Sequence, residues 1–193
     1  MNASNQPAAQ TLNVAQFLAP TAHQTASLQT RYCAVPYAYD GRTFYFSDLD
    51  GYNKGYAARL PVEEYEIQLV DGSDAEAQLF SLLGINQATL ERWFDEVVDL
   101  DEREQAALAF LISDLGLNLS DALDKLDDVN LREGSLLDAA TEFFDECYLN
   151  DIPEAVRFYI DYDAFARDQN LSGAMSELEF AGQTYTVTNA DAL

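Results

Sequence analysis

The fold is most clearly indicated by Leu90-Glu91-Arg92-Trp93-Phe94-Asp95-Glu96-Val97-Val98-Asp99. Its apolar residues recur at i, i+3, i+4, i+7 and i+8, which is the spacing of one face of an α-helix. Glu91, Asp95 and Asp99 recur at i, i+4 and i+8 on the opposite side. The stretch therefore predicts a helix with an apolar inner face and an acidic outer face.

Two further helices of this kind are predicted on the C-terminal side. One runs from about residue 101 to 115, with Gly116 as its C-terminal stop. Its inward side chains are Leu108, Leu111, Ile112 and Leu115. The other begins with Ser120 as its N-cap. It buries Leu123 and Leu126 and exposes Asp121, Asp124, Asp127 and Asp128.

A fourth helix is predicted to begin near Ser135. Its inward residues are Leu137, Ala140, Phe143, Phe144 and Cys147. Its exposed residues are Asp138, Glu142, Asp145 and Glu146. Four short amphipathic helices in succession indicate a small acidic helical bundle.

The segment before these helices is predicted to form a small sheet. Residues 43–46, 56–60 and 64–70 have the composition of strands. The first two are separated by residues 47–55, a loop rich in turn-forming residues. An N-terminal antiparallel sheet module is therefore expected.

The segment after the bundle is predicted to contain one more helix and a hairpin. Pro153 fits the first turn of this helix, and its aromatic inner face is formed by Ala155, Phe158, Tyr159, Tyr162 and Phe165. Residues 177–180 and 184–188 are predicted to pair as a closing β-hairpin through Ala181-Gly182.

The fold class expected from these patterns is α+β. The expected parts are a disordered tail at 1–30, an N-terminal β-rich module at 31–72, an acidic helical module at 73–150 and a C-terminal α+β module at 151–193. The tail is assigned because residues 1–30 contain no Lys, Arg, Asp or Glu and are rich in Ala, Gln, Thr, Asn and Ser.

The charge of the chain is extreme and unevenly distributed. Its 193 residues include 34 acidic and 10 basic residues, for a net charge of −24. Residues 61–151 alone carry 24 acidic and 4 basic residues, for −20. A small domain needs a magnitude of only about 2 to 8 for solubility, and self-repulsion opposes folding, so a specific use of the charge is indicated. Binding to nucleic acid or to an anionic membrane is disfavoured, because both need Lys and Arg.

The residues needed for common catalytic sites are missing. His23 is the only histidine and lies in the predicted tail, which leaves no Ser-His, Cys-His or His-metal site. The carboxylate pairs lie on solvent-facing helix sides rather than in a sugar-sized cleft. Asp48-Leu49-Asp50-Gly51 lacks the spacing of an EF-hand, and no phosphate-binding glycine motif occurs. We therefore expect no enzyme activity, no cofactor and no metal site.

The cellular setting is inferred from other absences. Cys33 and Cys147 are far apart and form no metal-ligand or redox motif, so both are expected to be reduced. No basic segment typical of a secretory signal precedes an apolar run, and no apolar stretch approaches the roughly 18 residues of a membrane span. A cytoplasmic protein is expected.

The charge itself is the candidate mechanism. Double-stranded DNA carries one negative charge per ~1.7 Å of its axis. A segment of −20 therefore supplies the charge of roughly 34 Å of duplex, and two copies supply that of about 68 Å. Such a protein could occupy a DNA-binding channel.

Two stretches resemble the ArdA family of antirestriction proteins. Residues 158–173 begin Phe158-Tyr159-Ile160-Asp161-Tyr162 and contain Ala166-Arg167-Asp168, followed by Leu171-Ser172-Gly173, and are similar to the C-terminal motif of that family. Residues 45–55, from Tyr45 to Gly55, are similar to its N-terminal motif. The resemblance covers about residues 43–188.

The resemblance implies an elongated, curved protein of three modules that dimerises and mimics bent B-form DNA. Family members occupy the DNA-binding site of Type I restriction-modification enzymes. The partner-binding residues are then exposed acids such as Glu91, Asp95, Asp99, Asp121, Asp124, Asp128, Asp138, Glu142 and Asp145. Asp161 and Arg167 are expected to be buried beside the aromatic helix and to have structural roles.

Two other hypotheses remain open. The first is a DNA mimic that inhibits another DNA-binding complex, such as an anti-CRISPR protein. The second is an acidic adaptor or chaperone for basic proteins, which would bind its partners with little selectivity.

Overall fold

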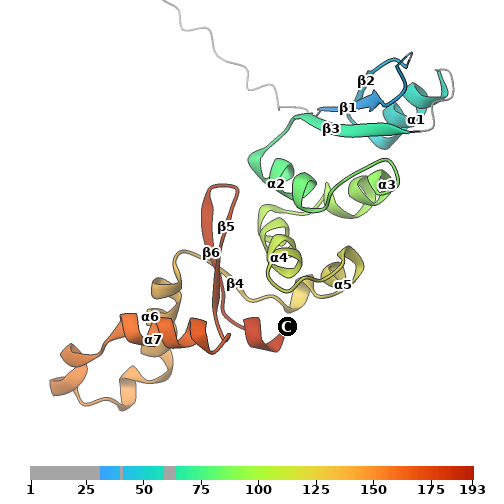
Figure 1. Cartoon of the computed structure of the whole chain (residues 1–193). Coiled ribbons are helices and arrows are strands. Elements are labelled where there is room, and N and C mark those ends of the chain that lie inside the picture. The colour runs from blue at the N-terminus through green and yellow to red at the C-terminus, as the bar shows by residue number, and fades with distance from the viewer. Residues whose placement is uncertain (1–30, 40, 59–63) are drawn as a thin grey trace, which may run out of the picture.

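The computed structural model describes residues 31–39, 41–58 and 64–193, so the tail predicted at 1–30 lies outside the described residues. The elements follow one another along an extended arc, with a small sheet at one end and helices α6 and α7 at the other (Figure 1). Helices occupy most of the region between two small antiparallel sheets. This arrangement confirms the α+β class.

The N-terminal sheet consists of β1 (Arg31–Pro36), β2 (Phe44–Phe46) and β3 (Tyr65–Asp71), paired antiparallel in the order β2-β1-β3. The strands predicted at 43–46 and 64–70 correspond to β2 and β3. Alternation along the strands places aromatic side chains on the inner face. There the Tyr32 and Phe46 rings stack with centroids 5.4 Å apart.

A helix follows β2, and the strand predicted at 56–60 is wrong over the residues that the structure describes. α1 (Leu49–Ala57) includes most of the predicted loop. Asp48 is its N-cap, and the side chain accepts a hydrogen bond from the Gly51 backbone nitrogen at 2.6 Å. The buried Tyr52 ring packs on the aromatic rings of β2. Capping and ring burial therefore outweigh the poor helix propensity of the glycines.

The middle of the molecule contains α2 (Asp74–Leu82), α3 (Leu90–Arg92), η2 (Trp93–Val97), α4 (Glu102–Ser113), α5 (Leu119–Asp124) and η3 (Leu126–Asp128). The helix predicted at 90–99 is α3 continued by η2, which is a π-helical turn closed by the bond from the Val98 nitrogen to the Trp93 carbonyl. The helix predicted from about residue 101 is α4. The chain turns at Gly116, whose φ of 68° favours glycine.

Asn118, and not Ser120, is the N-cap of α5. The Asn118 side chain accepts a hydrogen bond from the Asp121 backbone nitrogen at 3.1 Å. Both residue types are good caps, so composition alone does not separate them. Ser120 lies inside the helix, where its hydroxyl accepts a hydrogen bond from Arg92 at 3.1 Å.

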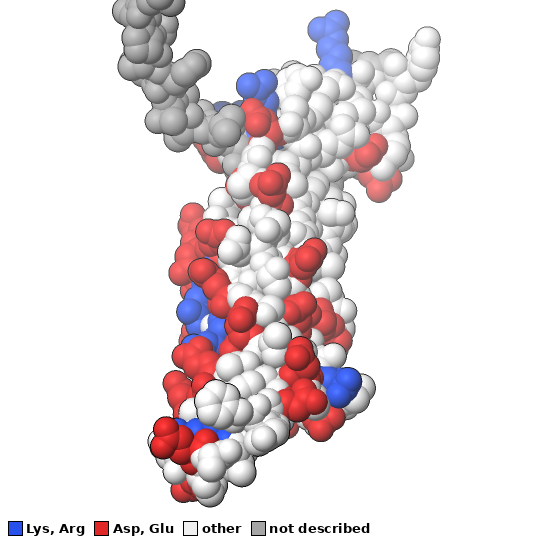
Figure 2. Space-filling view, turned by 90° about the vertical axis from the view of Figure 1, so that its left-hand side faces the viewer, with Lys and Arg blue, Asp and Glu red and all other residues white. Residues whose placement is uncertain are grey.

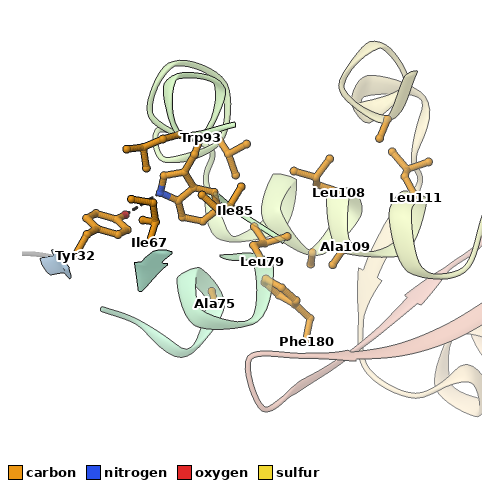
Figure 3. Packing of buried hydrophobic residues seen from close by; sticks show 14 of the residues in the cluster. Tyr32, Ile67, Ala75, Leu79, Ile85, Trp93, Leu108, Ala109, Leu111 and Phe180 are labelled. Atoms are coloured by element: carbon orange, nitrogen blue, oxygen red, sulfur yellow. Dashed lines mark hydrogen bonds between the residues drawn. The ribbon is translucent and has the colours of Figure 1, made fainter. Parts of the chain in front are cut away.

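One apolar core connects the N-terminal sheet, the central helices and the C-terminal hairpin. Figure 3 shows Leu79 of α2 and Phe180 of the hairpin close to the α4 side chains. The buried Trp93 indole donates a hydrogen bond to the Tyr32 hydroxyl at 2.8 Å, which joins η2 to β1. The central helices are therefore packed on the same core as the sheet.

The C-terminal part contains β4 (Leu131–Glu133), α6 (Leu136–Cys147), η4 (Leu149–Asp151), η5 (Glu154–Tyr159), α7 (Tyr162–Leu171), β5 (Ser176–Phe180), β6 (Gln183–Val187) and η6 (Ala190–Ala192). The sheet order is β4-β6-β5, and the β5–β6 hairpin corresponds to the predicted one. α6 begins after its N-cap Ser135, where the sequence predicted that a helix would begin. α6 packs against α7 rather than within the central helices, so the four predicted helices do not form one bundle.

Several apolar positions differ from the prediction. The single helix expected after Pro153 is divided into η5 and α7, because Asp161 caps a new helix by accepting from the Ala164 nitrogen at 2.9 Å. Phe158 and Tyr159 are consequently 93% and 85% exposed. Leu115, Leu137 and Cys147, which were expected inside, are also exposed, since α4 ends before Leu115 and α6 buries only one narrow face.

Candidate partner-binding surface

Acidic side chains follow the long axis of the molecule. Figure 2 shows them in two broken columns separated by a band of uncharged residues, over the part of the face below the N-terminal sheet. Basic side chains are conspicuous at the N-terminal end of the same view. The surface is therefore divided into a nearly neutral end and a long acidic part.

The nine acids expected from the sequence lie on successive elements of the acidic part. Glu91 lies on α3, Asp95 in η2 and Asp99 just after it. The others are Asp121 and Asp124 on α5, Asp128 in η3, and Asp138, Glu142 and Asp145 on α6. All nine are exposed except Asp145, which is half-buried.

Four of the nine carboxylates have side-chain partners inside the protein. The Asn118 amide donates to Asp121 at 2.7 Å, and the Ser135 hydroxyl donates to Asp138 at 2.6 Å. Arg132 forms an ion pair with Glu142. The Tyr162 hydroxyl donates to Asp145 at 2.5 Å, and this hydrogen bond raises the pKa of Tyr162 above its usual value.

The remaining five carboxylates point to solvent. Within the part of the chain that the structure describes, no side-chain hydrogen bond or ion pair is made by Glu91, Asp95, Asp99, Asp124 or Asp128. These five, which we call the open acids, are free to accept hydrogen bonds and ion pairs from a basic partner.

An acidic groove between α6 and α7 adds Asp163 to the carboxylates that the sequence placed together on one face of α6. It has a volume of 680 Å³. Its acidic lining consists of Asp138, Glu142, Asp145, Glu146 and Asp163. Asp163 was missed because it belongs to a separate helix, and no local signal predicts that α7 packs beside α6.

The described residues offer little for other chemistry. Among them, no group of three or more His, Cys, Asp or Glu side chains is arranged to hold a metal ion. The same residues contain no helix of the length and apolarity that crossing a bilayer requires. The arrangement can attract and contact cationic groups, and this follows directly from its exposed carboxylates.

A second exposed surface is apolar and lies at the far end from the N-terminal sheet. It comprises Tyr148, Val156, Phe158 and Tyr159, which belong to the segment that joins α6 to α7 and are 47%, 46%, 93% and 85% exposed. We call this set the apolar tip. Exposed apolar side chains gathered in one part of a surface commonly mark a protein–protein contact.

Comparison with known proteins gives one positive result. A family model described as antirestriction protein (ArdA) matches residues 44–182, which is well over half of the chain. The matched range begins at β2 and ends in the turn between β5 and β6. No curated protein matches the chain, and neither does any solved structure.

Proposed function

This chain belongs to the ArdA family of antirestriction proteins, and we propose that it acts as a DNA mimic. The proposed target is the DNA-binding site of a Type I restriction-modification enzyme. The proposed contacts are ion pairs and hydrogen bonds between its exposed carboxylates and the basic side chains that otherwise hold DNA phosphates. This is inhibition by occupancy, in the cytoplasm where such enzymes meet DNA, and it needs no cofactor.

The main support is the series of open acids from Glu91 to Asp128. They lie on or beside α3, η2, α5 and η3, which pack on a single core, rather than on a flexible acidic tail. Carboxylates on packed helices stay at fixed distances from one another, and the phosphates of a duplex are also regularly spaced. Specific replacement of DNA requires such spacing, because net charge alone steers partners with little selectivity.

We further propose that two copies associate through the apolar tip. The tip exposes Phe158 and Tyr159 almost completely, and aromatic side chains are enriched in the energetically dominant parts of interfaces. A homodimer would extend the acidic surface to the charge of about 68 Å of duplex, roughly 20 base pairs. That length suits an enzyme that contacts a long stretch of DNA.

The test is a competition titration. The purified protein is added to a Type I methyltransferase core bound to a labelled target duplex, at two salt concentrations. We expect stoichiometric displacement of the duplex that weakens as salt rises, because the contacts are ionic.

Two controls define the alternatives. If the folded protein fails to displace the duplex from this core, the restriction-enzyme target is wrong, and the same titration on a CRISPR surveillance complex tests the second DNA-mimic hypothesis. If the protein binds unrelated basic proteins, such as lysozyme, as tightly as the core, it is an unselective acidic adaptor.

A further inference from the structure

The cations of the acidic part have an unusual arrangement. Residues 61–151 contain four basic residues, Arg92, Arg103, Lys125 and Arg132. Each of the three arginines donates to a group on another element of the fold. The Lys125 side chain makes no ion pair within the described part of the chain. The arginines are therefore placed as links between elements, and Lys125 is a natural comparison for them.

Arg92 links η2 and α5. Its guanidinium donates to both Glu96 carboxylate oxygens, with Nε–O distances of 3.2 and 3.0 Å and an Nη2–O distance of 2.6 Å. The same Nη2 atom donates to the Ser120 hydroxyl at 3.1 Å. The bidentate contact orients the guanidinium plane, and the serine contact ties it to α5.

Arg103 and Arg132 meet at the short strand β4. Arg103 of α4 donates to the Leu131 carbonyl, and Arg132 of β4 pairs with Glu142 of α6. The strand is also paired with β6, where Leu131 opposes Val187. Arg103 therefore connects α4 to β4, and Arg132 connects β4 to α6.

We propose that these three arginines are positioning residues for two groups of carboxylates: Arg92 fixes the spacing within the first group, and Arg103 and Arg132 fix the spacing between the two groups. One group is the open acids from Glu91 to Asp128, and the other lies on α6. The inference rests on the proposed function, since spacing matters only if the acids match the positions of DNA phosphates.

The positive charge of the arginines allows the proposal to be tested against a simple dependence of affinity on net charge. Each arginine carries one positive charge, so it reduces the net negative charge that attracts a basic partner. If affinity followed net charge alone, neutralising any of the four cations would strengthen binding. If affinity depends on the spacing of the carboxylates, neutralising a linking arginine weakens binding, whereas neutralising Lys125 strengthens it slightly. The two views predict opposite signs for the same change of charge.

The experiment compares Arg132→Gln, Glu142→Gln and Lys125→Gln in the displacement titration. We expect Arg132→Gln to weaken displacement about fivefold to tenfold and Lys125→Gln to tighten it by less than about twofold, the scale of one exposed charge. Glu142→Gln breaks the same link from the other side and should also weaken binding. Arg132→Lys keeps the charge without the planar fork and should recover only part of the loss.

A second readout separates position from general stability. Spin labels on the exposed native Cys147 and on Asp127→Cys report the distance between α6 and the end of the central helices. We expect a broader distance distribution in Arg132→Gln than in the wild type or in Lys125→Gln, at a temperature where all variants are folded. This measurement needs no partner, so it tests the link even if the wild type fails to displace DNA.

Two results would overturn the proposal. One is an Arg132→Gln variant that displaces the duplex as well as, or better than, Lys125→Gln. The other is an unchanged distance distribution in both Arg132→Gln and Glu142→Gln. The wild-type titration judges the DNA-mimic function independently of either result.

Discussion

The N-terminal sheet and the central helices share one apolar core but differ in surface charge, which is nearly neutral on the sheet and strongly negative on the helices. The described residues from 31 to 71 include three basic and five acidic residues, whereas residues 72–151 include 4 basic and 20 acidic ones. Tyr32 of the sheet and Trp93 of the acidic part are hydrogen-bonded within the same core. A core of this kind therefore does not require an acidic exterior. The negative charge is a separate property of the outward helix faces. We infer that it serves binding rather than folding.

The largest effect is expected when the open acids are neutralised together. Replacing Glu91 by Gln and Asp95, Asp99, Asp124 and Asp128 by Asn should weaken displacement of the duplex by about 100-fold or more. Each exposed charge pair contributes about 0.2 to 1 kcal/mol, and tenfold in affinity corresponds to about 1.4 kcal/mol. The matched control is Glu64→Gln with Glu66→Gln on the sheet. An equal loss per charge in the control would show that only net charge matters.

Alkaline pH is expected to weaken the N-terminal sheet. Burial raises the pKa of Tyr32 and of Tyr52 to about 12. Because the folded state holds these protons more tightly than the unfolded chain, stability present below about pH 10 is lost between about pH 10 and 12. The loss is on the order of 2 to 3 kcal/mol per tyrosine.

Urea denaturation followed by Trp93 fluorescence at several pH values measures this loss. Tyr32→Phe should make the curve shallower over the same interval, although it also removes the hydrogen bond to Trp93. A wild-type stability that stays constant from pH 10 to 12 would contradict the prediction.

We expect the exposed aromatic residues of the apolar tip to contribute to self-association and the exposed ring at the N-terminal end to contribute nothing to it. Phe158→Ser combined with Tyr159→Ser should weaken self-association about 30-fold, which corresponds to about 2 kcal/mol for a central interface cluster. Tyr39→Ser removes an equally exposed ring from the N-terminal end and should leave the dimer unchanged. Sedimentation equilibrium over a range of concentrations measures both. A wild type that stays monomeric at all concentrations would rule out the proposed dimer.

Some carboxylates in both regions cap helices, and these should affect stability rather than binding. Asp48 caps α1 and Asp161 caps α7. Asp48→Ala and Asp161→Ala should each lower the free energy of unfolding by about 1 kcal/mol, with little change in displacement. Asp163→Ala is the control in the first turn of α7. If Asp161→Ala reduced displacement far more than stability, this residue would belong to the contact surface.

The outer faces of the helices could be predicted from the sequence because helical period is a local property. The spacing of Trp93, Val97 and the acids between them identified both faces, and Ser135 and Gly116 marked helix ends correctly. The positions of the open acids followed from this pattern. Asp161 and Arg167 were expected to be buried beside the aromatic helix, but both are exposed, and Asp161 caps α7.

The errors arose where tertiary contacts or competing caps decide the outcome. Residues 47–55 contain two glycines and were interpreted as a loop before a strand at 56–60, yet the burial of Tyr52 stabilises a helix from Leu49 to Ala57. Phe158 and Tyr159 were expected inside because their spacing fits one face of a single helix after Pro153, but the chain is divided there into η5 and α7 and leaves them exposed. The groove between α6 and α7 and the arginine links likewise depend on contacts between separate elements.

The smallest effect is expected from a single open acid. Asp95→Asn should weaken displacement by less than about fivefold, because one exposed pair contributes at most about 1 kcal/mol. The loss should shrink further as salt rises, since exposed charges are screened. Asp50→Asn on the N-terminal helix, which is paired with Lys54, should give no measurable change. If Asp95→Asn abolished displacement while its thermal unfolding matched the wild type, binding would depend on one dominant contact. The distributed surface would then be the wrong mechanism, and the difference in charge between the two regions would not explain the function.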